Sequence, residues 1–220
     1  MQEQANVNKR GQKIGLKGER ARQSLLDGLR TLLDLRHPWE ISVSDICGQS
    51  GVAQYNFYTY FSDVEEAILQ IAWVAAREQP ALVTLVPDDW KGTSGFDDAA
   101  RLVDETCRFW SRRASVLLIA DMLADRSVAT FLDVRRARRR PLIDAFAGHI
   151  GKGQAAGRIA PALDPFLTAV ETVTMLDAVG SHFASLSALG FRRDEIIGNA
   201  ARLLQHRMGE TMETRFSDQG

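Results

Sequence analysis

Apolar residues recur every three or four positions along almost the whole chain, which is the period of an amphipathic helix. Between Gly18 and Arg36, for example, they stand at positions 21, 25, 29, 32 and 33. No segment alternates apolar and polar residues in the way that a half-buried strand does. The sequence therefore predicts an all-α protein.

Turn and capping signals divide this pattern into separate helices. His37-Pro38 ends the first one, because proline disfavours helix at the residue before it. Ser42, with Asp45 three positions later, is the pattern of a capping box, and Gly51 suits the position that follows a helix. The predicted helices cover residues 18–36, 43–49, 53–60, 62–78, 97–112, 115–125, 127–151, 164–188 and 192–209, with a loop over residues 80–96.

The cysteines and histidines of the chain limit the kinds of metal site and catalytic site that it can form. Cys47 and Cys107 lie far apart, and the histidines form no His-x-x-x-His pair, so no metal site is expected. No Gly-rich phosphate loop or nucleophile elbow is present. We therefore expect neither catalytic residues nor a cofactor. No apolar run approaches the roughly 20 residues of a membrane helix, and the pattern indicates a cytoplasmic protein with reduced thiols.

The net charge of −1 conceals a basic N-terminal arm. Six Lys or Arg residues stand between positions 8 and 22, where there is a single acid. Such an arm, taken alone, is more often a solvated tail than a binding element. It becomes a candidate for contact with DNA, through Lys9, Arg10 or Lys13, when a DNA-binding element follows it.

Residues 42–61 have the layout of such an element. Two short helices are joined by a tight turn that contains glycine, with a longer helix on either side, as in a helix-turn-helix. In the second short helix, Phe57 and Phe61 are four positions apart and can anchor it to a core. Its other side chains carry amides, hydroxyls and aromatic rings, which can contact base edges and phosphates. A fully buried aromatic helix is the alternative, and the number of polar groups argues against it.

The run from Ile41 to Ile68 resembles the N-terminal signature of the TetR family of bacterial transcriptional regulators. That signature combines a Thr/Ser-Val-x-x-Ile start, an Ala-Gly-Val turn and an aromatic close that is followed by acidic residues. Val64 stands where the family usually has Lys, which implies one phosphate contact fewer. Within the family, residues 41–61 and 127–188 resemble the ethionamide-resistance regulators of actinobacteria. The matching residues are Ser42, Val43, Asp45, Ile46, Gly51, Val52, Phe57, Tyr58, Tyr60, Phe61, Glu65 and Glu66.

The resemblance implies a plan of about nine helices in two domains. Residues 1–65 would form the arm and a three-helix DNA-binding domain, and residues 66–220 a domain that binds an effector and dimerises. The implied protein is a homodimeric repressor, which a small-molecule effector releases from a palindromic double-stranded DNA operator. The candidates for DNA contact are Lys9, Arg10, Lys13, Ser42, Ser44, Gln54, Tyr55, Asn56, Tyr58, Thr59 and Tyr60.

The helices predicted at 164–188 and 192–209 would form the dimer interface by the same resemblance. An effector pocket would be walled by apolar and small polar side chains of the helices between residues 97 and 188. These candidates are Val103, Thr106, Cys107, Trp110, Met122, Val134, Arg138, Phe146, Thr172, Met175 and Val179.

Helical phase places Arg138 on an apolar stripe between Val134 and Leu142. A cation on such a face is costly unless it is paired. We expect its partner to be a carboxylate, with Glu171 as the first candidate, or the effector itself. The alternative is that its guanidinium extends to the surface.

Two other functions are compatible with the pattern. A helical small-molecule-binding protein or an enzyme could retain a vestigial DNA-binding end, and it would then show no steep salt dependence of binding to duplex DNA. A nonspecific nucleoid protein would show little sequence preference and no response to an effector.

Overall fold

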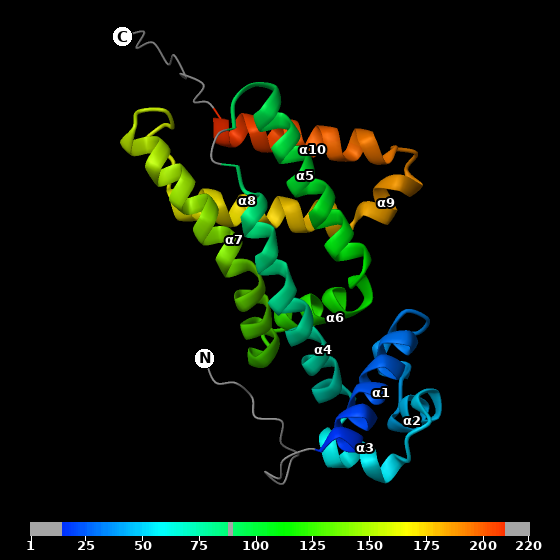
Figure 1. The fold of residues 1–220 in the computed structure, drawn as a ribbon. Coiled ribbons are helices and arrows are strands. Elements are labelled where there is room, and N and C mark those ends of the chain that lie inside the picture. Colours follow the sequence, from blue (N-terminus) through cyan, green and yellow to red (C-terminus); the bar gives the residue numbers. More distant parts are fainter. Residues whose placement is uncertain (1–14, 88–89, 210–220) are drawn as a thin grey trace. The chain divides into compact units, whose positions relative to one another are not determined.

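The structure is a computed structural model that describes residues 15–87 and 90–209. Ten α-helices and two short 3-10 helices make up all the regular structure in these residues, without a strand, which confirms the all-α prediction (Figure 1). The described residues fall into two compact units. One lies within Met1–Arg77 and Ser115–Arg135, and the other within Glu78–Ala114 and Arg136–Gly220.

The first unit packs the N-terminal helices around one apolar core. Phe57 and Leu29 are completely buried in it, together with residues of the later helices such as Phe131. Its elements are α1 (Leu16–Leu33), η1 (Pro38–Glu40), α2 (Val43–Ser50), α3 (Gln54–Tyr60), α4 (Val64–Glu78, to residue 77), α6 (Ala114–Asp125, from residue 115) and the first turns of α7 (Ala129–Ala155).

The turn between α2 and α3 has the predicted stereochemistry. The hydroxyl of Ser42 accepts a hydrogen bond from the backbone N–H of Asp45, whose carboxylate in turn accepts one from the N–H of Ser42. Gly51 follows α2 with a φ of 67°, in the left-handed region that favours glycine. The predicted capping box and C-cap are therefore confirmed, and they fix where the chain turns into α3.

The second unit is built around α5 (Gly92–Ser111), which packs against both α8 and α10. Trp90, Trp110 and Phe146 are almost completely buried in its core. Its other elements are η2 (Gln79–Leu85), the rest of α7, α8 (Pro165–Ser181), α9 (Phe183–Ala188) and α10 (Arg193–Gly209).

The loop predicted over residues 80–96 is wrong at both of its ends. Residues 79–85 form η2, and α5 begins at Gly92, five residues before the predicted start. One of the glycines that suggested a loop, Gly95, makes a close contact instead, because a Cβ on it would lie only 2.2 Å from the carbonyl carbon of Trp90. Gly95 thus lets the first turn of α5 pack directly on the backbone that carries a buried tryptophan.

The single helix predicted over residues 164–188 is also wrong, because the chain breaks at His182 into α8 and α9. The sequence Gly180-Ser181 precedes the break, and Gly/Ser pairs are common kink sites. There the hydroxyl of Ser181 donates to the carbonyl of Ala178, in competition with the helical ladder. By contrast, α7 continues through Pro141, although proline is disfavoured in the interior of a helix.

Candidate functional site

Helix α3 presents two different faces. Phe57 and Phe61, just after the helix, are 0% and 1% exposed and lie in the core of the first unit. Tyr55 and Tyr58, by contrast, are 79% and 54% exposed. The helix is therefore held by its phenylalanines and offers its tyrosines to solvent.

The predicted DNA-contact residues divide by burial. Ser42, Ser44, Gln54, Tyr55 and Tyr58 are exposed, whereas the side chains of Asn56, Thr59 and Tyr60 are partly buried. Within the described part of the chain, no polar side chain of α3 hydrogen-bonds to another residue. Lys9, Arg10 and Lys13 lie outside the described residues.

Three of these candidates also have structural contacts. The ring of Tyr58 lies edge-on to that of Phe57, with the ring centres 5.6 Å apart. The hydroxyl of Ser42 is engaged in the capping box of α2, and the ring of Tyr60 packs against the core beside Phe61. Gln54, Tyr55 and Tyr58 are therefore the exposed side chains of α3 best placed for a partner.

The capping box is also an electrostatic feature of this surface. Hydrogen bonds from the side chain and backbone of Ser42 lower the pKa of Asp45 to about 2, and Arg36 adds to the effect. The Nη2 of Arg36 lies 3.1 Å from an Asp45 carboxylate oxygen. Because the folded pKa is depressed, this contribution to stability is present above about pH 4 and is lost as the pH falls towards 2.

Replacing Ser42 with Ala tests the cap. We expect the free energy of unfolding to fall by about 1 kcal/mol, the usual cost of losing an N-cap side chain. The pKa of Asp45 should rise towards its ordinary value, because its largest stabilising hydrogen bond is gone. Urea denaturation and an NMR titration of the carboxyl measure the two effects, and an unchanged pKa would contradict the assignment.

Sequence reasoning missed Arg22, which ties α1 to the helices behind α3. Its Nη2 donates to Oε1 of Gln70 at 3.1 Å, and its guanidinium carbon lies 5.8 Å from the centre of the Phe61 ring. In the sequence Arg22 is only one member of a basic arm, since spacing carries no signal for a partner 48 positions away. The exposed cations that α1 does offer are Lys17 and Arg20.

The predicted effector wall is brought together only in part. Besides Arg138, eight of the predicted residues lie in the second unit. Two of them, Met175 and Val179, are partly buried. The other six are at most 2% exposed: Val103, Thr106, Cys107, Trp110, Phe146 and Thr172. Met122 and Val134 belong to the first unit. The residues in the second unit are closely packed, and burial raises the pKa of the Cys107 thiol to about 11.

Arg138 is buried and paired, but not with Glu171. It is 1% exposed, and its Nη1 donates to Oδ1 of Asp177 at 3.1 Å and to Oε1 of Gln79 at 2.9 Å. Glu171 instead pairs with Arg207. The expected carboxylate is thus present further along α8, and extension of the guanidinium to the surface is excluded.

Asp177 is the centre of this network. Besides Arg138 it accepts hydrogen bonds from Nε1 of Trp110 at 3.0 Å, from Nε of Arg139 at 2.7 Å and from Nε2 of Gln79 at 3.3 Å. The Arg138 guanidinium carbon also lies 5.0 Å from the centre of the Trp110 ring. The polar contacts that a buried ion pair needs are therefore supplied by η2, α5, α7 and α8.

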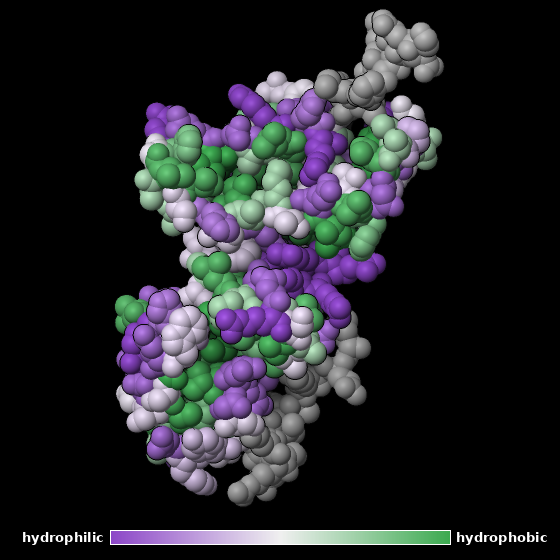
Figure 2. Space-filling view, turned by 180° about the vertical axis from the view of Figure 1, so that it is seen from behind, coloured by the Kyte–Doolittle hydropathy of each residue, from purple (hydrophilic) through white to green (hydrophobic). Residues whose placement is uncertain are grey.

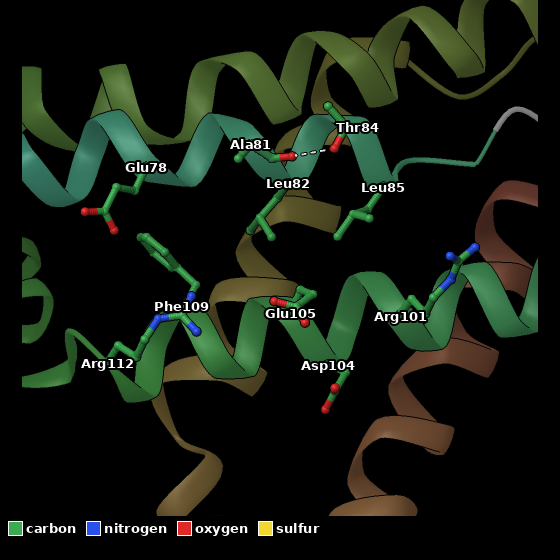
Figure 3. Close-up of a pocket in the computed structure, with 10 residues that line it drawn as sticks. All are labelled: Glu78, Ala81, Leu82, Thr84, Leu85, Arg101, Asp104, Glu105, Phe109 and Arg112. Atoms are coloured by element: carbon green, nitrogen blue, oxygen red, sulfur yellow. Dashed lines mark hydrogen bonds between the residues drawn. The ribbon is translucent and has the colours of Figure 1, made fainter.

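A groove of about 450 Å³ lies elsewhere in the second unit, between η2 and α5. Figure 3 shows Leu82, Leu85 and Phe109 between the two helices, with Arg101 and Arg112 towards opposite ends of the row. None of the predicted wall residues lines it. The remaining lining residues are Glu78, Ala81, Thr84, Asp104 and Glu105.

Clusters of metal-ligating side chains and helices able to cross a membrane are both absent from residues 15–87 and 90–209. These residues contain no group of three or more His, Cys, Asp or Glu side chains arranged to hold a metal ion. None of their helices combines the length and the low polarity that crossing a membrane requires.

Several solved structures that share this fold are described as TetR-family transcriptional regulators. One from Syntrophomonas wolfei is 17% identical with a TM-score of 0.62, over 89% of this chain and 98% of that one. The fatty acid degradation regulator FadR from Bacillus halodurans is 14% identical with a TM-score of 0.59, over 90% and 97%. The reduced form of E. coli NemR is 15% identical with a TM-score of 0.61, over 87% and 99%.

A comparison at the level of sequence identifies the family. No curated protein shows a significant match to the chain. The family model described as "Tetracyclin repressor-like, C-terminal domain" matches residues 82–214, which is more than half of the chain. The protein therefore belongs to the TetR family of DNA-binding transcriptional regulators, which are not enzymes.

Proposed function

We propose that the chain is a homodimeric repressor that binds a palindromic operator and leaves it when a small molecule binds. The observation that carries the proposal is the division of α3 into the buried Phe57 and the exposed Tyr55 and Tyr58. A recognition helix needs such a division, because one face must hold it while the other enters the major groove.

The DNA-binding domain of this proposal is residues 1–65, and the remainder of the chain binds effector and dimerises. Base edges would be contacted from α3, and phosphates from the start of α2 and from the basic N-terminal arm. A protein with access to operator DNA would be cytoplasmic. The proposed contacts are Lys9, Arg10, Lys13, Ser42, Ser44, Gln54, Tyr55, Asn56, Tyr58, Thr59 and Tyr60.

Dimerisation is proposed through α8 and α10. Two half-sites one helical turn apart, about 34 Å, require a two-fold assembly. Phe166 and Leu167 on α8 are 48% and 58% exposed, and Leu203 on α10 is 52% exposed. Figure 2 shows hydrophobic patches among hydrophilic residues on the part of the molecule that carries these helices. A second copy would remove such side chains from water.

The effector is proposed to bind within the second unit. In one arrangement, the ligand separates α5 from α7 and α8, and the buried residues Trp110, Phe146 and Thr172 line the pocket that forms. In the other, the ligand occupies the groove beside η2, which is already open. Only a ligand with different affinities for the bound and released states can shift the protein between them. Within the family, we propose the ethionamide-resistance regulators as the subgroup, from residues 41–61 and 127–188.

Replacing Tyr58 with Phe tests the proposed DNA surface. The hydroxyl has no hydrogen bond to a described residue, so its loss should leave the melting temperature unchanged. If it reaches a phosphate, affinity for the operator should fall by about 1 kcal/mol, the usual value of one hydrogen bond.

Fluorescence anisotropy with the DNA upstream of the gene measures this at several salt concentrations. The proposal expects tight duplex binding that weakens steeply with salt. Equal affinities of the variant and the parent would remove Tyr58 from the surface. If the parent protein does not bind this DNA in preference to unrelated duplex DNA, the proposed repressor function is overturned. The alternative, a small-molecule-binding protein, then remains.

A further inference from the structure

Neither α2 nor α3 contains a Lys or Arg residue. No Lys or Arg stands between Arg36 and Arg77, a range that includes all of α2 and α3 and nearly all of α4. The only charged groups that closely follow α3 are acidic, in the first turn of α4, where Asp63 caps the N–H of Glu66. Apart from Arg36, which pairs with Asp45, the nearest cations before α2 belong to α1 or to the segment before it.

This absence restricts which bases α3 can read. Guanine is most often recognised by a bidentate Arg or Lys on its O6 and N7 atoms, and cytosine by an acidic acceptor for its amino group. The seven residues of α3 include neither kind of side chain. They do include the carboxamides of Gln54 and Asn56, whose geometry fits the N6 and N7 atoms of adenine.

The exposed apolar surface points to the partner base. Thymine differs from the other bases in the major groove by its C5 methyl group, which is read by apolar contact. Tyr55 presents the most exposed ring of α3, and the methyl group of Thr59 is one turn further along the same face. Since these side chains are not tied by hydrogen bonds to described residues, they are available to the groove.

We propose that α3 reads A·T base pairs directly, with Gln54 on adenine and the ring of Tyr55 against a thymine methyl group. The inference rests on the proposed function and adds the chemical identity of the bases. Guanines in the operator would then lie outside the segment that α3 contacts. Tyr55 is the specificity-determining residue, and its ring rather than its hydroxyl is the recognising group.

Single-atom changes in the operator test this with the full-length chain. The operator is first obtained by selection from a random duplex library. Each thymine is then replaced in turn by uracil, which removes only the methyl group, and each guanine by 7-deazaguanine, which removes N7. We expect one or more uracils per half-site to weaken binding by about threefold to fivefold, the value of one buried methyl group. The 7-deazaguanine substitutions elsewhere in each half-site should have no effect.

Variants of Tyr55 assign the contact. In Tyr55→Ala the sensitive uracil should no longer matter, whereas Tyr55→Phe should keep the full effect because it keeps the ring. Both variants should melt like the parent, since the side chain is 79% exposed. Neutral uracils combined with a strong loss at 7-deazaguanine would overturn the inference and leave DNA binding intact. If the parent selects no sequence at all, the proposed function fails with it.

Discussion

Replacing Asp177 with Ala is expected to lower the free energy of unfolding by about 3–5 kcal/mol, because it removes a carboxylate that pairs with a buried guanidinium. Arg138 is 1% exposed and cannot turn to water, and the indole N–H of Trp110 loses its acceptor in the same step. Urea denaturation followed by circular dichroism measures the loss.

The matched control is Asp144→Ala, which removes an exposed carboxylate paired with Arg140 on α7. Surface pairs of this kind contribute about 0–1 kcal/mol, so the control should stay close to the parent. The double replacement Asp177→Leu with Arg138→Met should recover much of the loss, since it removes both charges. Equal effects of Asp177→Ala and Asp144→Ala would contradict the network.

Gly180→Ala is expected to destabilise the second unit by about 1–3 kcal/mol through overpacking. A Cβ at Gly180 would lie 2.3 Å from Cδ1 of Trp110 and 2.8 Å from its Cγ. The indole cannot withdraw easily, because it is 1% exposed and its N–H is bonded to Asp177. Equilibrium urea unfolding of the variant gives the value.

Gly148→Ala supplies the comparison for that change. Gly148 lies in α7, and a Cβ placed on it would have no atom within 4 Å, so alanine should stabilise the helix by about 0.5–1 kcal/mol. In a Trp110→Leu background the penalty at Gly180 should largely disappear. A penalty that persists there would show that the contact with Trp110 is not its cause.

Local signals in the sequence are sufficient to predict the geometry of α2, α3 and the turn between them. The capping box of Ser42 and Asp45, the glycine turn and the phenylalanine spacing each act within a few residues, and the structure has all three. The prediction of a loop over residues 80–96 fails at Gly95, which lies in a helix and is needed there because the backbone of Trp90 is too close for a Cβ. From sequence alone, a glycine in a turn cannot be distinguished from a glycine at such a close contact.

The sequence did not predict the partners of Arg138, because they are distant from it along the chain. The phase of α7 correctly places Arg138 in the core, but Asp177 is 39 positions away and Gln79 is 59. The same phase argument applied to α8 finds Asp177, which lies one turn after the buried Val173. At the break at His182, the hydroxyl of Ser181 donates to the same Ala178 carbonyl as the backbone N–H of His182, a side-chain contact that periodicity does not register.

A base-resolution footprint of the full-length protein on the DNA upstream of its gene tests the central claim most directly. If α3 is the recognition helix of a two-fold dimer, protection should fall on two inverted half-sites whose centres lie about 34 Å apart or a multiple of that distance. Tyr55→Ala should weaken both half-sites equally. A single unpaired site, or protection spread evenly along the duplex, would contradict the account.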